Sequence, residues 1–264
     1  MDPNSPTTDT AMPRAMGLNR WRAAGIHLLL SAGIAIVAIV LMLKVWYPPP
    51  LFTAEGGNDL LFILVGVDVI LGPLITLIIF KSGKPGLRFD LTMIAVFQVC
   101  ALVYGCYVMF VARPVYIAFV VDQFEIVRAT ELDPADVARA RYPQFRSLPV
   151  SGPAVIAVDI PTDKAVLKNL LSDAMNNGTV VQHLPQYYVP YADQRKQALA
   201  QSQPLDAALK AGEKFATSAE KYLAESGRKA ADLRVLRLGT RRGWGTALID
   251  AKTGDLVQLL PPPL

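Results

Sequence analysis

The sequence predicts two parts of different class: a membrane α-helical part, built as a three-helix transmembrane bundle, and a periplasmic α+β domain. Three apolar runs, at about residues 25–46, 59–80 and 89–111, precede a remainder, residues 113–264, that mixes short strand-like and helix-like segments. A helix needs ~20 apolar residues to cross a hydrocarbon core of ~30 Å. Each run has that length, and a hydrophobic fraction of 52% is high for a soluble chain.

The first run has the basic start and apolar core that a secretory signal also has. It is, however, longer than the ~7–15 residues of a signal core. It ends at Trp46 and Tyr47, followed by three prolines, rather than at a small-residue cleavage site. Aromatic rings suit the membrane interface, and the prolines prevent the helix from continuing. We therefore expect a transmembrane helix here.

The second run carries a line of small and polar residues. Asp68, Gly72 and Thr76 are spaced i, i+4, i+8, so they share one face of a helix. A carboxylate at this depth costs ~2.5–3.5 kcal/mol on insertion scales, so it normally faces protein or water and has a partner. Pro73 lacks an amide donor and leaves a carbonyl that Thr76 or a neighbouring helix has to satisfy.

The other two runs carry matching polar residues: His27 in the first, Asp90 and Gln98 in the third. Their depths allow a hydrogen bond between the side chains of Asp68 and Gln98, and a pair between His27 and Asp90. Three interpretations of these residues stay open: contacts that hold the bundle together, a docking surface for another transmembrane helix, and an ion or proton path. We favour the first, then the docking surface, and place the ion or proton path last because one buried acid without a second charge makes a poor relay.

Basic residues give the orientation, because Lys and Arg near helix ends stay on the cytoplasmic side. Arginines precede the first run, the loop after it has none, and the loop between the second and third runs has Lys81, Lys84 and Arg88. We expect residues 1–24 to be a cytoplasmic segment, residues 25–112 to hold three spans of a bacterial inner membrane, and residues 113–264 to form the periplasmic domain.

The exported part predicts a β-hairpin from 114–121 and 124–128, a short helix capped by Asp133, and a strand at 154–160. A helix capped by Thr162 then ends at Asn177-Gly178, and a further strand covers 179–184. Residues 193–232 predict two or three helices, and residues 233–260 predict strands. The mixed order of these strands and helices along the chain does not predict how the strands are arranged in a sheet.

No catalytic set is evident in the exported part, which has one histidine, His183, and no cysteine. The sequence therefore predicts no enzyme, no metal site and no cofactor. The segment 239–245 predicts a tight hairpin, in which Arg241 and Arg242 are candidates to contact a peptide or a carboxylate. Tyrosines near residue 190 either pack on their own domain or contact a partner: Tyr187, Tyr188 and Tyr191.

Net charge excludes one class of partner. The formal charge of +4 is small, and no part of the chain concentrates Lys and Arg densely enough for a nucleic-acid surface. We expect no nucleic acid, and the lipid bilayer as one partner.

Several blocks in order resemble the type IV pilin accessory protein family, the TfpX/TfpZ group. They are the segment 20–31, Trp46-Tyr47-Pro48, the segment 66–76 and Lys84-Pro85. The resemblance implies an inner-membrane accessory protein or chaperone that assists a cognate type IV pilin in pilus biogenesis. Binding would be non-catalytic, through the transmembrane bundle and the periplasmic domain, with other pilus assembly components as further partners. A membrane-anchored periplasmic sensor and a transport subunit stay as alternatives.

Overall fold

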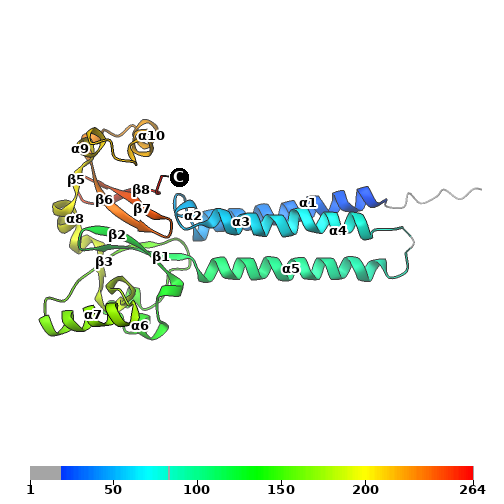
Figure 1. Cartoon of the computed structure of the whole chain (residues 1–264), viewed down its shortest axis with the longest axis horizontal. Helices are drawn as coiled ribbons and strands as arrows, with labels where there is room; N and C mark the ends of the chain where they lie inside the picture. Colours follow the sequence, from blue (N-terminus) through cyan, green and yellow to red (C-terminus); the bar gives the residue numbers. More distant parts are fainter. Residues whose placement is uncertain (1–18, 83, 264) are drawn as a thin grey trace, which may run out of the picture. The chain divides into compact units, whose positions relative to one another are not determined.

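The computed structural model describes residues 19–82 and 84–263, which form two compact units (Figure 1). The helical unit comprises the described residues up to Ala35 together with Leu64–Leu102. The sheet unit comprises Ile36–Ile63 and the chain from Val103 onward. Most of the cytoplasmic segment predicted for residues 1–24 lies outside the described residues.

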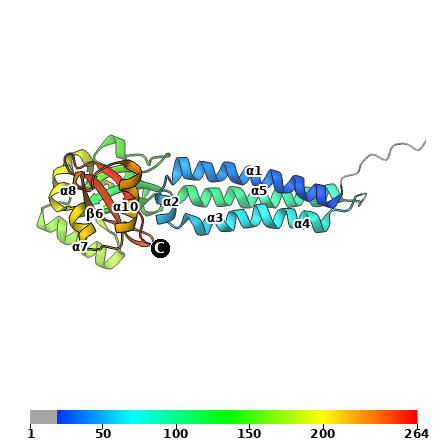
Figure 2. The same ribbon diagram turned by 90° about the horizontal axis from the view of Figure 1, so that it is seen from above.

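All three apolar runs are helical, as predicted, and Figure 2 shows the three helices running alongside one another. The first helix is α1, which continues into the π-helical turn η1 and stops before Pro48. The second is made of consecutive α, π and α segments, and the third is α5. Their bounds are α1 Arg20–Leu41, η1 Met42–Trp46, α3 Gly57–Val65, η2 Gly66–Leu71, α4 Gly72–Ile79 and α5 Leu87–Val111.

Two of these helices are long and apolar enough to cross a membrane, by length and composition: Arg20–Trp46 and Leu87–Val111. The segment Gly66–Ile79 is a shorter apolar helix. Large apolar side chains point outward from all three helices. Leu29, Ile78 and Phe97, for example, are 74%, 73% and 68% exposed.

The sheet unit is built on one mixed sheet with the order β4-β3-β1-β2-β6-β7-β8, and β5 pairs with β6 off this path. β1 runs parallel to β3, and β2 parallel to β6, while the other pairs are antiparallel. The strands are β1 Pro114–Val120, β2 Gln123–Arg128, β3 Ala154–Val158, β4 Tyr188–Pro190, β5 Gln203–Pro204, β6 Leu233–Thr240, β7 Gly243–Asp250 and β8 Leu256–Leu260.

The predicted hairpin at the start of this unit is confirmed. β1 and β2 pair from Val120 opposite Gln123 down to Pro114 opposite Arg128. The two turn residues are Val121 and Asp122, one position earlier than the sequence suggested, and Val121 has a positive φ of 58°. A β-branched residue rarely adopts this conformation, which explains why the sequence suggested a turn one residue later.

β1 lies inside the sheet and is buried along its whole length. Because side chains alternate between the two faces of a strand, β1 contributes to two hydrophobic clusters. Ile117 and Phe119 belong to one cluster, with Phe124 of β2, whereas Ala118 and Val120 belong to the other. The sheet therefore has an apolar core on each face.

Several helices pack against this sheet. α6 contributes Val137 to the cluster around Ala118, while α9 and α10 contribute Leu205 and Ala219 to a third cluster beside β6, β7 and β8. Figure 1 shows α6 and α7 near β3, and α9 and α10 near β6. The helices are α2 Leu51–Ala54, α6 Pro134–Ala138, α7 Lys164–Asn177, α8 Arg195–Gln201, α9 Leu205–Lys210 and α10 Ala216–Ser226.

Two local predictions in this unit were wrong. Residues 179–184 form no strand; Val181–His183 is a 3-10 turn, as is Pro185–Tyr187 after it. The helix α7 is capped by Asp163 rather than Thr162, since the Asp163 carboxylate accepts the backbone N–H of Ala165 at 2.8 Å. The predicted Asp133 cap of α6 and the Gly178 end of α7 are confirmed.

The segment between the first two helices is part of the sheet unit. Leu51 of α2 is 2% exposed and belongs to the same cluster as Phe119 and Phe124. The Tyr47 hydroxyl donates to the Met109 carbonyl at 3.0 Å. The segment preceding α3 and the chain after α5 therefore fold together.

A polar cluster between apolar helices

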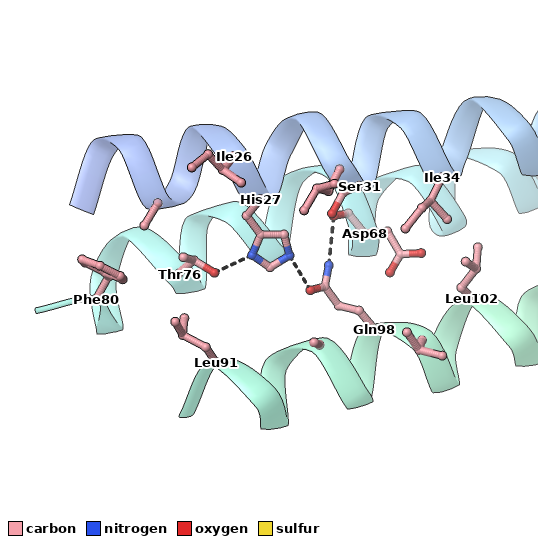
Figure 3. Close-up of a pocket in the computed structure, with 14 residues that line it drawn as sticks. Ile26, His27, Ser31, Ile34, Asp68, Thr76, Phe80, Leu91, Gln98 and Leu102 are labelled. Carbon is pink, nitrogen blue, oxygen red and sulfur yellow. Dashed lines mark hydrogen bonds between the residues drawn. The ribbon is translucent and has the colours of Figure 1, made fainter. Parts of the chain in front are cut away.

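The helical unit contains a connected set of polar side chains, one or more from each helix (Figure 3). His27 comes from α1, Asp68 and Thr76 from the second helix, and Gln98 from α5. Thr76 is 2% exposed and Asp68 6% exposed. Helical periodicity explains the arrangement, because Asp68 and Thr76 lie eight residues apart on one face. The structure thus brings together four of the residues that the sequence singled out.

The Gln98 side chain completes the backbone hydrogen bonding of the second helix. In the π segment the Gly72 N–H donates to the carbonyl of Val67, five residues earlier. The Asp68 carbonyl would next need the N–H of residue 73, which proline lacks. The Gln98 amide Nε2 donates to this carbonyl at 3.0 Å instead. The predicted hydrogen bond between the Asp68 and Gln98 side chains does not form, because the Gln98 amide binds the Asp68 backbone carbonyl and not the carboxylate.

This bond fixes the hydrogen-bonding pattern of His27. Because Gln98 uses its NH₂ group on the Asp68 carbonyl, its Oε1 faces the His27 ring, 2.7 Å from Nε2. Nε2 must therefore carry the proton and donate it. Nδ1, 2.6 Å from the Thr76 hydroxyl, accepts from that hydroxyl when the ring is neutral. The chain Thr76, His27, Gln98 and Asp68 carbonyl is satisfied throughout with a neutral imidazole.

Gly72 makes room for this chain. A Cβ at Gly72 would lie 2.1 Å from the Gln98 Nε2, far inside contact distance. Gly66, one and a half turns earlier, has nothing within 4 Å of its own Cβ position. Of these two glycines, only Gly72 is needed for the close approach of α5.

The polar cluster forms one wall of a cavity of about 440 Å³ within the helical unit. Figure 3 shows His27, Thr76 and Gln98 linked across it, with Asp68 beside them and apolar residues around them. The Asp68 Oδ1 is buried, and within the described residues it has no hydrogen-bond partner. The cavity is otherwise lined by Ala23, Ile26, Leu30, Ser31, Ile34, Phe80, Leu91, Ala95, Val99 and Leu102.

The predicted pair between His27 and Asp90 does not form. Asp90 instead accepts from Lys84 Nζ at 2.6 Å, a contact between partly exposed side chains. His27 is already bonded at both ring nitrogens, to Thr76 and Gln98. The prediction was wrong because helix counting gave depth but not the rotation of each helix about its axis.

The tyrosines proposed as contact residues lie mainly in the core of the sheet unit. Tyr188 is 0% and Tyr191 6% exposed. The Tyr188 hydroxyl donates to the Gln182 carbonyl and that of Tyr191 to the Gly254 carbonyl, both at 2.5 Å. Tyr187 is partly buried against the cluster that includes Tyr188. The interpretation of Tyr188 and Tyr191 as exposed contact residues was wrong, whereas packing on their own domain is confirmed.

The hairpin predicted at 239–245 is confirmed as the turn between β6 and β7, and its arginines contact carboxylates of this chain. The Arg242 guanidinium donates to Asp59 at 2.7 Å. The Arg241 N–H approaches Glu55 Oε1 at 3.4 Å. Both acids lie in the segment before and at the start of α3. The turn therefore contributes to holding that segment on the sheet.

Glu55 and Arg128 form a partly buried ion pair that the sequence analysis missed. The Arg128 Nε donates to Glu55 Oε2 at 2.5 Å, and the Glu55 side chain is 2% exposed. Arg128 also binds Glu131 at 2.6 Å. Burial opposes the charge on Arg128, but the hydrogen bond and charge of Glu55, with Glu131, outweigh it and raise the pKa of Arg128. Glu55 itself could have indicated such a pair, because it is an acid between the largely apolar residues 51–54 and two glycines.

His183 lies beside the same group of charges, with Nε2 3.6 Å from Glu131 Oε2. Burial lowers the pKa of His183 below its usual 6.5; the Glu131 charge opposes this shift and the Arg128 charge adds to it. In the part of the chain that the structure describes, no three His, Cys, Asp or Glu side chains gather as a metal site would require.

Comparison with known proteins points to fimbrial assembly. A family model described as fimbrial assembly protein FimB matches residues 17–56. Two Dichelobacter nodosus proteins, the fimbrial assembly proteins of serogroups I and E1, are 29% and 30% identical over 186 residues, which is 70% of this chain and 72% of each relative. The protein of serogroups C1 and C2 is 36% identical over 108 residues, 40% of this chain and 82% of that relative. No solved structure matches the chain.

Proposed function

The chain belongs to the family of fimbrial assembly proteins that act with type IV pili, and we propose that it is an inner-membrane accessory protein that binds a type IV pilin during pilus assembly without catalysing a reaction. The observation that carries the proposal is the similarity over 186 residues to proteins named for fimbrial assembly. The names of these relatives refer to assembly, for which binding of the subunit is sufficient.

Burial supports a membrane location for the helices. Only 6% of the most apolar stretch of α5 is buried, and 22% of the most apolar stretch of the first helix. A helix of equal length in the core of a soluble protein would be mostly buried. Extended exposed apolar surface is unfavourable in water and favourable in lipid. The outward-facing Leu29, Ile78 and Phe97 therefore support a lipid-facing surface.

Packing within the sheet unit supports three spans rather than two. The segment before α3 binds the chain after α5 through Leu51, through Glu55 with Arg128, and through Asp59 with Arg242. Those two parts must lie on the same side of any membrane, so the chain between them crosses an even number of times. If α5 crosses once, the helix from Gly57 to Ile79 must cross as well. Its 23 residues span ~34 Å at ~1.5 Å per residue, which is sufficient.

The basic flanks complete the arrangement that we propose. Arg20 and Arg22 precede the first helix, and Lys81, Lys84 and Arg88 lie between the second and third helices. With these ends in the cytoplasm, the sheet and the helices that pack on it lie in the periplasm. The membrane helix of a pilin would then meet the polar cluster of the helical unit, and the exported domain of the pilin would meet the sheet.

Deletion of the chain tests the function. We expect cells without it to lose surface pili, and measurement of total pilin in the same cells separates failed assembly from loss of the subunit. Complementation with the full chain should restore pili. Unchanged pili would contradict the proposal.

Single cysteines test the topology in a variant without Cys100 and Cys106. A membrane-impermeant maleimide applied to intact spheroplasts should label Asn58→Cys and Ser218→Cys, and should leave Ser82→Cys unlabelled until the membrane is permeabilised. Labelling of Ser82→Cys together with protection of Ser218→Cys would overturn the orientation.

A further inference from the structure

We propose that the cavity of the helical unit receives part of an apolar membrane helix that carries one cationic group, and that this cation pairs with the Asp68 carboxylate. The inference rests on the proposed function, because the helix is taken to be that of the fimbrial subunit the protein assists. It adds the chemistry of the partner: a basic side chain or a free amino group placed within an otherwise apolar segment.

The carboxylate of Asp68 is the unused group in the cluster. Its Oδ1 has no hydrogen-bond partner among the described residues, although the residue is only 6% exposed. The neighbouring polar groups are engaged with one another: His27 with Thr76 and Gln98, and Gln98 with the Asp68 backbone. Buried ionisable groups in membranes normally have partners, so this carboxylate lacks the one it would be expected to have.

The helical unit does not provide a cation at this depth. The cavity lining contains no Lys or Arg, and its one histidine, His27, is bonded through both ring nitrogens to Thr76 and Gln98 rather than to the Asp68 carboxylate. In the described part of the unit, Lys and Arg lie only at the helix ends: Arg20, Arg22, Lys81, Lys84 and Arg88. Lys81 is thirteen positions from Asp68, or ~20 Å along the helix. The described residues of the helical unit therefore offer the Asp68 carboxylate no Lys or Arg, and we take its charge partner to come from another molecule.

The rest of the lining fits an apolar helix. Ile26, Leu30 and Ile34 follow one another at i, i+4, i+8 on α1, and Leu30 and Ile34 are 63% and 50% exposed. Opposite them on α5, Val99 is 55% exposed, while the small Ala95 permits a close approach. A helix with its side chains is ~10 Å across, so a space of 440 Å³ takes its side chains and not its backbone.

A cation is a better match for this site than a neutral polar group. A carboxylate buried in low dielectric gains most from a full opposite charge, and a pair that forms only on docking would make binding selective for helices with a basic group. Asn has the same shape as Asp and still forms hydrogen bonds, but it has no charge. Asp68→Asn therefore separates charge pairing from hydrogen bonding, and Asp68→Glu retains the charge.

Photo-crosslinking in the native membrane tests the proposal with the full chain. A benzophenone residue at Leu30 or Val99 lies at the cavity, whereas the same residue at Leu29 or Val96 is a control on the same helix outside the cavity lining. We expect the fimbrial subunit to be captured from Leu30 and Val99 and not from the controls. Capture should fall about tenfold or more in Asp68→Asn, since a buried charge pair is lost, and persist in Asp68→Glu.

The outcomes separate this inference from the proposed function. Capture from Leu30 that is equal in wild type and Asp68→Asn would overturn the charge pairing and leave docking of the subunit intact. Absence of capture from both cavity positions, or capture of lipid alone, would overturn docking in the cavity as well. Mass spectrometry of the wild-type product adds a test that needs no Asp68 variant: a captured membrane segment without Lys, Arg, His or an amino terminus contradicts the proposal.

Discussion

Gln98 on α5 donates its amide to the backbone carbonyl of Asp68 on the second helix at 3.0 Å. A side chain of one helix thereby supplies the hydrogen bond that Pro73 removes from another. The same amide group accepts from His27, so the three helices of the helical unit meet at one side chain. Satisfying a backbone carbonyl in this way matters more in lipid than in water, because no water is available as a substitute.

Replacement of Gln98 by Leu should destabilise the helical unit. The Asp68 carbonyl and the His27 Nε2–H would both lose their partner, at a cost of about 1–3 kcal/mol for buried polar groups left unpaired. The free energy of unfolding in mixed detergent micelles measures the effect. Val96→Leu, an apolar change at an exposed position one half-turn away, is the control and should have little effect. Equal stability of the two variants would contradict the role given to Gln98.

Gly72→Ala should be destabilising although alanine favours helices. Alanine gains up to ~1 kcal/mol in helix propensity over glycine. Here its Cβ would lie 2.1 Å from Gln98 Nε2 and would displace the side chain that binds both His27 and Asp68. Gly66→Ala, in the same helix with open space around it, should be neutral or stabilising. Unfolding of both variants in micelles gives the comparison, and a more stable Gly72→Ala would refute the close-contact argument.

Glu55→Gln should destabilise the sheet unit strongly. It removes the charge that faces the partly buried Arg128, which keeps Glu131, and the loss of a hydrogen bond between charged groups costs about 1.5–3 kcal/mol. Thermal unfolding and the rate of proteolysis in micelles measure the loss. Glu225→Gln removes the partner of Lys221 in an exposed pair and should change stability by no more than about 1 kcal/mol. Similar losses in the two variants would show that the Glu55 pair contributes little.

Stability of the sheet unit should decrease below about pH 6.5 with a contribution from His183. Burial lowers the pKa of His183 from 6.5 in the folded protein, so the unfolded chain binds more protons as the pH falls through this value. Protonation then favours unfolding, and the stability is fully present only above pH 6.5. The melting temperature measured from about pH 8 to about pH 5.5 should fall less in His183→Gln than in wild type. Parallel pH profiles would exclude the contribution.

The sequence was sufficient where local chemistry decides the structure. Apolar runs gave the three helices, because their length and composition leave few alternatives to helix. The Asp133 cap and the glycine at position 178 gave two helix boundaries, and two neighbouring segments rich in β-branched and aromatic residues gave the hairpin of β1 and β2. Even here the hairpin turn and the cap of α7 were one residue off, since neighbouring residues offered similar local chemistry.

Helix rotation and sheet order were decided only by tertiary packing. Residue counting placed His27 and Asp90 at similar depth, but His27 turns to Thr76 and Gln98, and Asp90 to Lys84. Likewise, Tyr188 is buried because the strand that it begins closes the edge of the sheet against β3. Such contacts join residues far apart in the chain, so no local pattern encodes them.

The sequence by itself thus determined the apolar helices, the limits of several elements and the family resemblance. Only the tertiary structure placed Glu55 in a pair with Arg128, 73 residues away, and assigned Gln98 to the carbonyl left by Pro73. The physical reason is the same in both cases. A buried polar group needs a partner, and which distant side chain provides it depends on how the helices and strands pack.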